Sequence, residues 1–335
     1  MNAKSIVSTV VVLGFLVSGV EAARAQTKKE EVEKNEKAES TLKSSDQTPN
    51  KPATAELTKT EEVKTPDEVE KAEATKNNRM RALEGAQSPW SLQAQLSYSG
   101  STIQTPFDEF APNPGGDNPP PVVKLSGLIQ TRYRFDETRS FGAGAGITTE
   151  TPFQKPTNTT VSDPTFDYAM SSNWGGAHNR VDLTATVYTN NYETKYLYAY
   201  GLTLADDLLY QVGESGLTFG LSSLIYGNAF RGETVDGVDV RAVQTDYGLG
   251  LYPLAEYQMT KKLNLRSVVG FQYEHVRDMA ALSLREKRIY QTLGLGVSIT
   301  ENFFTYFFAL FYPSPLNGIR NEETSVGFSA IINVF

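Results

Sequence analysis

Large apolar side chains alternate with small or polar ones along most of the chain from residue 90 onward. In one segment, for example, Tyr196, Tyr198, Tyr200, Leu202 and Leu204 occupy every second position. A period of two is typical of β-strands, because successive side chains of an extended backbone point to opposite sides. The chain is therefore expected to form many strands, each with one apolar and one polar face.

The alternation predicts strands in eleven ranges, with a twelfth, short strand at Asp207–Gly213. The eleven ranges are 90–98, 123–135, 141–147, 181–187, 196–204, 217–225, 247–257, 263–273, 289–299, 303–312 and 326–334. Asp206 and Asp207 are read as a tight turn, where Asp is favoured. With the short strand the count is about 12, and the alternative is about ten. The number is expected to be even, because an even number of strands places both chain termini on the periplasmic side.

The predicted connections fall into two length classes that alternate along the chain. Short ones lie near 136–139, 190–193, 213–216, 259–262 and 300–302, and long ones span 100–121, 151–179, 227–245, 275–287 and 313–323. Such alternation is typical of a membrane barrel, with short periplasmic turns and long extracellular loops. A soluble sandwich or lipocalin-like barrel would show the same periodicity with its apolar face turned inward. Aromatic residues at strand ends and strands of about ten residues favour the membrane barrel.

Residues 1–25 read as a secretory signal peptide, with Lys4 before an apolar run and Ala23-Arg-Ala25 as the cleavage motif. Residues 26–87 are rich in Lys, Glu, Thr, Ala and Pro and are expected to be a disordered periplasmic tail. We assign 88–335 to the barrel. The tail could bind peptidoglycan or a periplasmic protein.

Composition excludes several classes of protein. The chain has no cysteine, so disulfides, thiol catalysis and a lipid-anchoring cysteine are excluded. No later stretch reaches about 18 continuous apolar residues, which argues against helical membrane spans. The net charge is -8 and no basic cluster resembles a nucleic-acid interface, so no nucleic-acid partner is expected.

The last predicted strand ends in an aromatic residue, Phe335. The signal, the strand pattern over 89–335 and this terminal Phe together resemble the outer-membrane β-barrel proteins of diderm bacteria. The resemblance is to a class and implies a transmembrane antiparallel up-and-down β-barrel in contact with outer-membrane lipid. It also implies that Phe335 belongs to a signal read by the barrel assembly machinery.

Charged residues lie on the polar face of several predicted strands and are the candidates for lining the lumen. They are Arg132, Arg134, Arg180, Asp182, Glu256, Arg266 and Glu274. In one interpretation the arginines line a narrow water-filled path that favours anions or polar solutes. In the other, they pair with the acidic residues in a network that plugs a small barrel. Phe304, Tyr306 and Phe308 would also face inward and narrow the interior.

No motif predicts catalysis, a metal or a cofactor. The two histidines, His178 and His275, lack a serine at a spacing that suggests a nucleophile and its base. We therefore expect a structural or porin-like channel protein rather than an enzyme. An outer-membrane hydrolase or protease, and an envelope-organising protein whose tail binds the cell wall, are the alternatives.

Overall fold

The computed structural model describes residues 79, 82, 83, 88–113, 121–155, 157–174, 176–190, 194–313 and 320–334. The chain divides into two compact units, Met1–Lys71 and Ala72–Phe335, and every described residue belongs to the second. The signal-peptide prediction for 1–25, most of the predicted tail and Phe335 itself lie outside the described residues.

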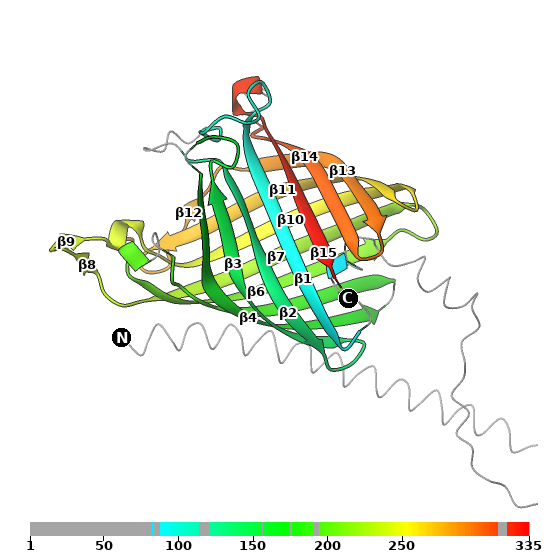
Figure 1. Ribbon diagram of the computed structural model, residues 1–335, viewed down its shortest axis with the longest axis horizontal. Helices are drawn as coiled ribbons and strands as arrows, with labels where there is room; N and C mark the ends of the chain where they lie inside the picture. Colours follow the sequence, from blue (N-terminus) through cyan, green and yellow to red (C-terminus); the bar gives the residue numbers. More distant parts are fainter. Residues whose placement is uncertain are drawn as a thin grey trace, which may run out of the picture. The chain divides into compact units, whose positions relative to one another are not determined.

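Twelve long antiparallel strands form a closed barrel (Figure 1). They are β1 (Trp90–Thr102), β2 (Lys124–Arg134), β3 (Arg139–Glu150), β4 (Asn158–Trp174), β5 (Ala177–Val187), β6 (Tyr198–Gln211), β7 (Leu217–Phe230), β10 (Thr245–Thr260), β11 (Leu263–Val276), β13 (Tyr290–Thr300), β14 (Phe303–Phe311) and β15 (Ser325–Asn333). Each pairs with its neighbours in sequence, and pairing of β1 with β15 closes the cylinder. No helix among the described residues is long and apolar enough to cross a membrane.

The connections differ in length at the two ends of the barrel. Short turns occupy 135–138, 212–216, 261–262 and 301–302, and the connection from β4 to β5 lies at the same end. At the opposite end lie the longer connections, which carry β8 (Thr234–Val235), β9 (Val238–Asp239), β12 (Arg285–Glu286) and the 3-10 turns η1 (Arg241–Val243) and η2 (Asn321–Glu323). Below, these are called the short-turn end and the long-loop end.

The predicted count of 12 strands is confirmed, but one strand was not predicted and another was predicted as two separate strands. The range 151–179, predicted as a loop, contains β4, whose many Thr, Ser and Asp residues hide its alternation. The predicted turn at Asp206 and the short strand after it belong instead to one continuous strand, β6. Aspartate favours turns in isolation, but here Asp207 is paired in the ladder with Arg180 of β5. The connection near 190–193 consequently lies at the long-loop end.

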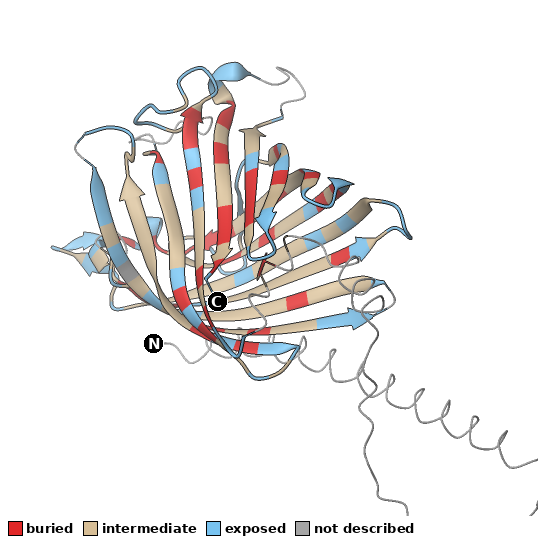
Figure 2. Cartoon of the chain, turned by 45° about the vertical axis from the view of Figure 1, so that its right-hand side comes forward, coloured by how far each residue is buried: buried red, intermediate tan, exposed pale blue. Residues whose placement is uncertain are grey.

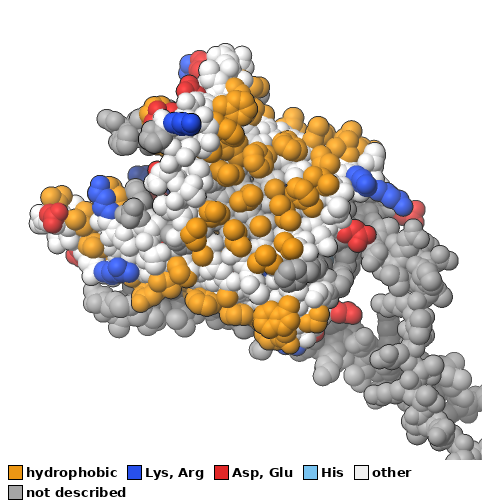
Figure 3. All heavy atoms as spheres, viewed as in Figure 1, with side chains coloured by type: hydrophobic (Ala, Val, Ile, Leu, Met, Phe, Trp, Pro, Cys, Tyr) orange, Lys and Arg blue, Asp and Glu red, His pale blue; other side chains and the backbone are white. Residues whose placement is uncertain are grey.

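The outward face of the strands is apolar. Ile129, Phe141, Phe166, Leu221, Leu265 and Leu295 are among its exposed residues. Figure 2 shows exposed and buried positions along the strands, and Figure 3 shows hydrophobic side chains over the middle of one face with charges towards its edges. Exposed aromatic rings gather near the short-turn end: Trp90, Trp174, Tyr210, Phe219 and Tyr257. The buried side chains of the strands lie on the opposite, inward face, and most of them are polar or charged.

Candidate functional site

Two buried arginines lie on the inward face, in the half of the barrel nearer the short turns. Arg180 of β5 forms a two-pronged ion pair with Asp182, with Nε and Nη2 at 2.7 and 2.6 Å from the carboxylate oxygens. Arg132 of β2 lies 3.9 Å from Asp167 of β4. Strand β3 lies between β2 and β4, and its residue at this level is Gly142. A side chain at Gly142 would overlap the Asp167 carboxylate. The glycine thus lets the two charges approach across an intervening strand.

A third ion pair lies on the other side of the barrel. Glu256 of β10 and Arg266 of β11 are direct cross-strand partners, and Glu256 Oε1 is 3.0 Å from Arg266 Nε. Both side chains are more than nine-tenths buried. The Arg266 guanidinium lies 5.5 Å from the ring centre of Tyr306, a cation–π contact with β14.

Three described residues that precede β1, Arg79, Ala82 and Leu83, are helical and lie among these groups. Below, they are called the segment. Ala82 has no exposed surface and packs against Phe304, Tyr306 and Ile331 of β14 and β15. Leu83 also packs against the buried cluster of Leu209 and Leu254, which come from β6 and β10. Since these strands come from opposite parts of the barrel wall, the segment occupies the interior between them.

Polar side chains of the wall bind the backbone of this segment. Ala82 O accepts hydrogen bonds from Gln93 Nε2 at 3.2 Å and from Asn333 Nδ2 at 2.8 Å. Leu83 O accepts one from Arg132 Nη1 at 2.5 Å and one from Arg180 Nη1 at 2.9 Å. Buried carbonyls need such partners, because an unpaired one costs about 1–3 kcal/mol. The segment is therefore held by specific bonds as well as by apolar packing.

The segment also contributes a charge of its own. Arg79 Nη1 lies 3.7 Å from Asp207 Oδ2, and Asp207 accepts a further hydrogen bond from Ser222 of β7. Arg79, Ala82 and Leu83 fall in the range 26–87 that we assigned to a disordered tail. At these three positions the chain is helical and in contact with the barrel.

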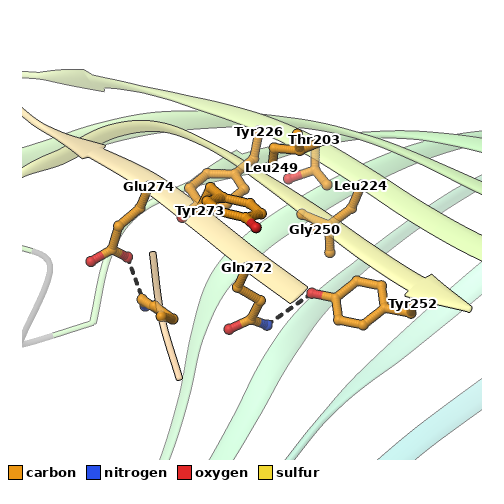
Figure 4. A pocket seen from close by; sticks show the side chains of 10 residues that line it. Thr203, Leu224, Tyr226, Leu249, Gly250, Tyr252, Gln272, Tyr273 and Glu274 are labelled. Carbon is orange, nitrogen blue, oxygen red and sulfur yellow. Dashed lines mark hydrogen bonds and ion pairs between the residues drawn. The ribbon is translucent and has the colours of Figure 1, made fainter. Parts of the chain in front are cut away.

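A cavity of about 300 Å³ lies on the long-loop side of these contacts. Its lining comes from β6, β7, β10 and β11, together with Lys287 of the loop after β12, and Figure 4 shows nine of the side chains by name. The ring of Tyr226 covers Gly248, and Tyr252 covers Gly250 and accepts a hydrogen bond from Gln272 at 2.8 Å. The interior thus holds open space on the long-loop side of the described residues of the segment.

The remaining predicted lumen residues lie away from this cluster. Glu274 pairs with Arg285 of β12 and with Lys287, whose Nζ is 2.7 Å away, so it faces loop cations rather than the interior arginines. Arg134 is half-buried at the end of β2, beside the turn 135–138. Whether any of the seven residues lines a conducting path stays a prediction.

Sequence reasoning missed several members of the site. Asp167 was lost with β4, and Asp207 was read as a turn residue. Ala82 and Leu83 are two apolar residues in a charged stretch, beside Arg79 and Arg81. A short apolar motif next to the first strand is the signal that could have identified them, but it is too short to have a measurable periodicity.

His275 is fully engaged in the structure. Its Nδ1 lies 2.6 Å from Asp246 Oδ1, its Nε2 lies 3.2 Å from Ala280 O, and its ring stacks on Tyr247. His178 Nδ1 lies 2.6 Å from Asn173 Oδ1 at the opposite, short-turn end. The two histidines are therefore not brought together.

Comparison with solved structures identifies a protein with the same barrel fold, and two further similar structures score lower. An outer membrane channel from Pseudomonas putida F1 superposes with a TM-score of 0.50 at 11% identity, covering 75% of this chain and 98% of that one. The NanC porin gives 0.42 at 9% identity, over 73% and 100% of the two chains, and OmpF of Salmonella typhi with daunomycin gives 0.34 at 9%, over 73% and 95%. No family model and no curated protein matches the sequence. The likeness confirms the predicted resemblance at the level of the barrel fold.

Proposed function

We propose that this protein is a channel of the bacterial outer membrane that passes small polar solutes, and that the inserted segment around Ala82 and Leu83 holds it closed. The observation that carries the proposal is a barrel whose interior is lined by polar groups and occupied by a stretch of its own chain whose described residues take part in no strand pairing. A segment held by a few hydrogen bonds and small apolar contacts can leave without disrupting any strand pairing.

The outer surface supports the membrane location. The strands of a closed barrel satisfy their backbone hydrogen bonds by pairing with each other. The exposed face of this barrel is apolar and carries a belt of aromatic side chains near the short-turn end. The shared fold with the Pseudomonas putida outer membrane channel supports a channel role and an outer-membrane location.

Single-channel recording in planar bilayers tests the function. Ala82→Lys places a cation in an apolar pocket close to Arg132 and Arg180, so it should expel the segment and produce steady current. The control Ser88→Lys adds the same charge at an exposed position and should behave like the wild-type protein, which is mostly closed. A folded, inserted Ala82→Lys barrel that carries no current would favour the competing interpretation, a permanently plugged structural protein.

We also infer a non-enzymatic role, because the shared fold is that of an outer membrane channel and Nε2 of His275 contacts a backbone carbonyl rather than a nucleophile. Insertion by the barrel assembly machinery, a periplasmic tail and binding of that tail to peptidoglycan are further proposals that rest on the sequence. Retention of the full chain on peptidoglycan, compared with a variant whose residues 26–78 are scrambled, tests the last of these.

A further inference from the structure

Two guanidinium groups converge on a single oxygen atom in the closed barrel. Arg132 and Arg180 each donate from Nη1 to Leu83 O, although they come from β2 and β5. Both side chains are at least nine-tenths buried. A carbonyl oxygen has two lone pairs, and here these two donors alone can fill both.

From this geometry we infer that Arg132 and Arg180 form a binding site for small carboxylates, and that Leu83 O is the internal stand-in for the carboxylate oxygen. The inference rests on the proposed channel function and names the class of solute. An ionised carboxylate accepts stronger hydrogen bonds from guanidinium than a neutral carbonyl does. A carboxylate solute therefore competes with the segment for the same two donors.

The neighbouring donors favour the same chemistry. Gln93 Nε2 and Asn333 Nδ2 point at Ala82 O, so four buried side chains present N–H groups to two successive carbonyl oxygens. Arg132 Nε has no hydrogen-bond partner in the described part of the chain. When the segment leaves, Nη1 of both arginines and Nδ2 of Asn333 face the vacated space and need oxygen acceptors, whereas Gln93 Nε2 keeps Asn333 Oδ1 at 2.9 Å.

The nearby carboxylates do not turn the site into a cation site. Asp182 is held by two hydrogen bonds from Arg180, and Asp167 faces Arg132. Asp182 thus orients the Arg180 guanidinium and leaves its Nη1 directed at the segment, while Asp167 lies 3.9 Å from Arg132 and balances part of its charge. The planar guanidinium of an arginine held in this way binds a planar carboxylate better than the flexible ammonium group of a lysine would.

Competition between solute and segment is measured by the accessibility of residue 82. The chain has no cysteine, so Ala82→Cys provides the only thiol. In the full-length protein, benzoate should accelerate labelling of this thiol by a polar maleimide at least about tenfold in a saturable manner. Benzamide, which has the same shape without the charge, should leave the rate unchanged.

Variants of the two arginines complete the test. Arg132→Gln in the Ala82→Cys background should raise the half-effective benzoate concentration about tenfold or more, as expected for the loss of one hydrogen bond to a charged group. Arg132→Lys should restore part of the response, and Arg134→Gln, on the same strand, should leave it unchanged. Unchanged labelling in benzoate, or an equal response to benzamide, would overturn the carboxylate site. These outcomes do not depend on current, so the site and the channel function can fail separately.

Discussion

Glu256 and Arg266 face each other directly across β10 and β11, with Glu256 Oε1 3.0 Å from Arg266 Nε. Glu256→Gln leaves a buried guanidinium without the carboxylate opposite it, so we expect the free energy of unfolding to fall by about 3–5 kcal/mol. Urea unfolding in lipid vesicles, followed by tryptophan fluorescence, measures the change. Glu256→Leu combined with Arg266→Met should recover most of the loss, and a double variant no better than Glu256→Gln would contradict the account.

The ion pair between Arg79 and Asp207 anchors the segment to β6. Arg79→Gln and Asp207→Asn should each raise the open probability in planar bilayers, because each removes the same attraction. The two effects should not add, and a coupling of about 1 kcal/mol, or roughly fivefold in open probability, is typical of residues in contact. Additive effects would show that the two side chains act independently.

The sequence predicts the barrel well because the lipid-facing stripe is a strong and regular signal. It predicts that Arg180, Asp182, Arg266 and Glu256 lie on the inward face, because they occupy polar positions opposite a clean apolar stripe. Which acid pairs with which arginine comes from the structure. The sequence-based prediction fails for β4, where many Thr, Ser and Asp residues hide the apolar alternation and make the segment resemble a polar loop. The inserted segment is beyond such reasoning, because its place depends on contacts with residues far along the chain, such as Ile331 and Asn333.

Close packing between strands predicts a strong contrast between two glycines. A methyl group at Gly294 would overlap the backbone oxygen of Phe307 on β14, whereas at Gly227 it would meet only Asp246 O at 3.7 Å. Gly294→Ala should therefore lower stability by about 1–3 kcal/mol, as overpacking does. Gly227→Ala should be neutral or slightly stabilising. Urea midpoints of the two variants test the prediction, and equal midpoints would argue against the strand spacing described here.

The pairing of Asp239 with Arg241, beside the small hairpin of β8 and β9, can be tested by titration. A side-chain hydrogen bond from Arg241 lowers the pKa of Asp239 to about 2, below its ordinary value near 4. The stabilisation from this pairing is thus present above about pH 4 and is lost as the pH falls through the folded-state pKa. Carboxyl NMR shifts of Asp239 should titrate near pH 2 in the wild type and near pH 4 in Arg241→Gln. Identical midpoints would exclude the pairing in solution.

The position of the segment inside the barrel is tested most directly by the reactivity of single cysteines in the absence of any solute. Ala82 has no exposed surface and Ser88 is exposed, although only a few residues separate them. Ala82→Cys should react with a polar maleimide at least about a hundredfold more slowly than Ser88→Cys, because labelling requires the segment to leave. Equal rates for the two cysteines would mean that the segment does not occupy the interior, and the closed state proposed here would be wrong.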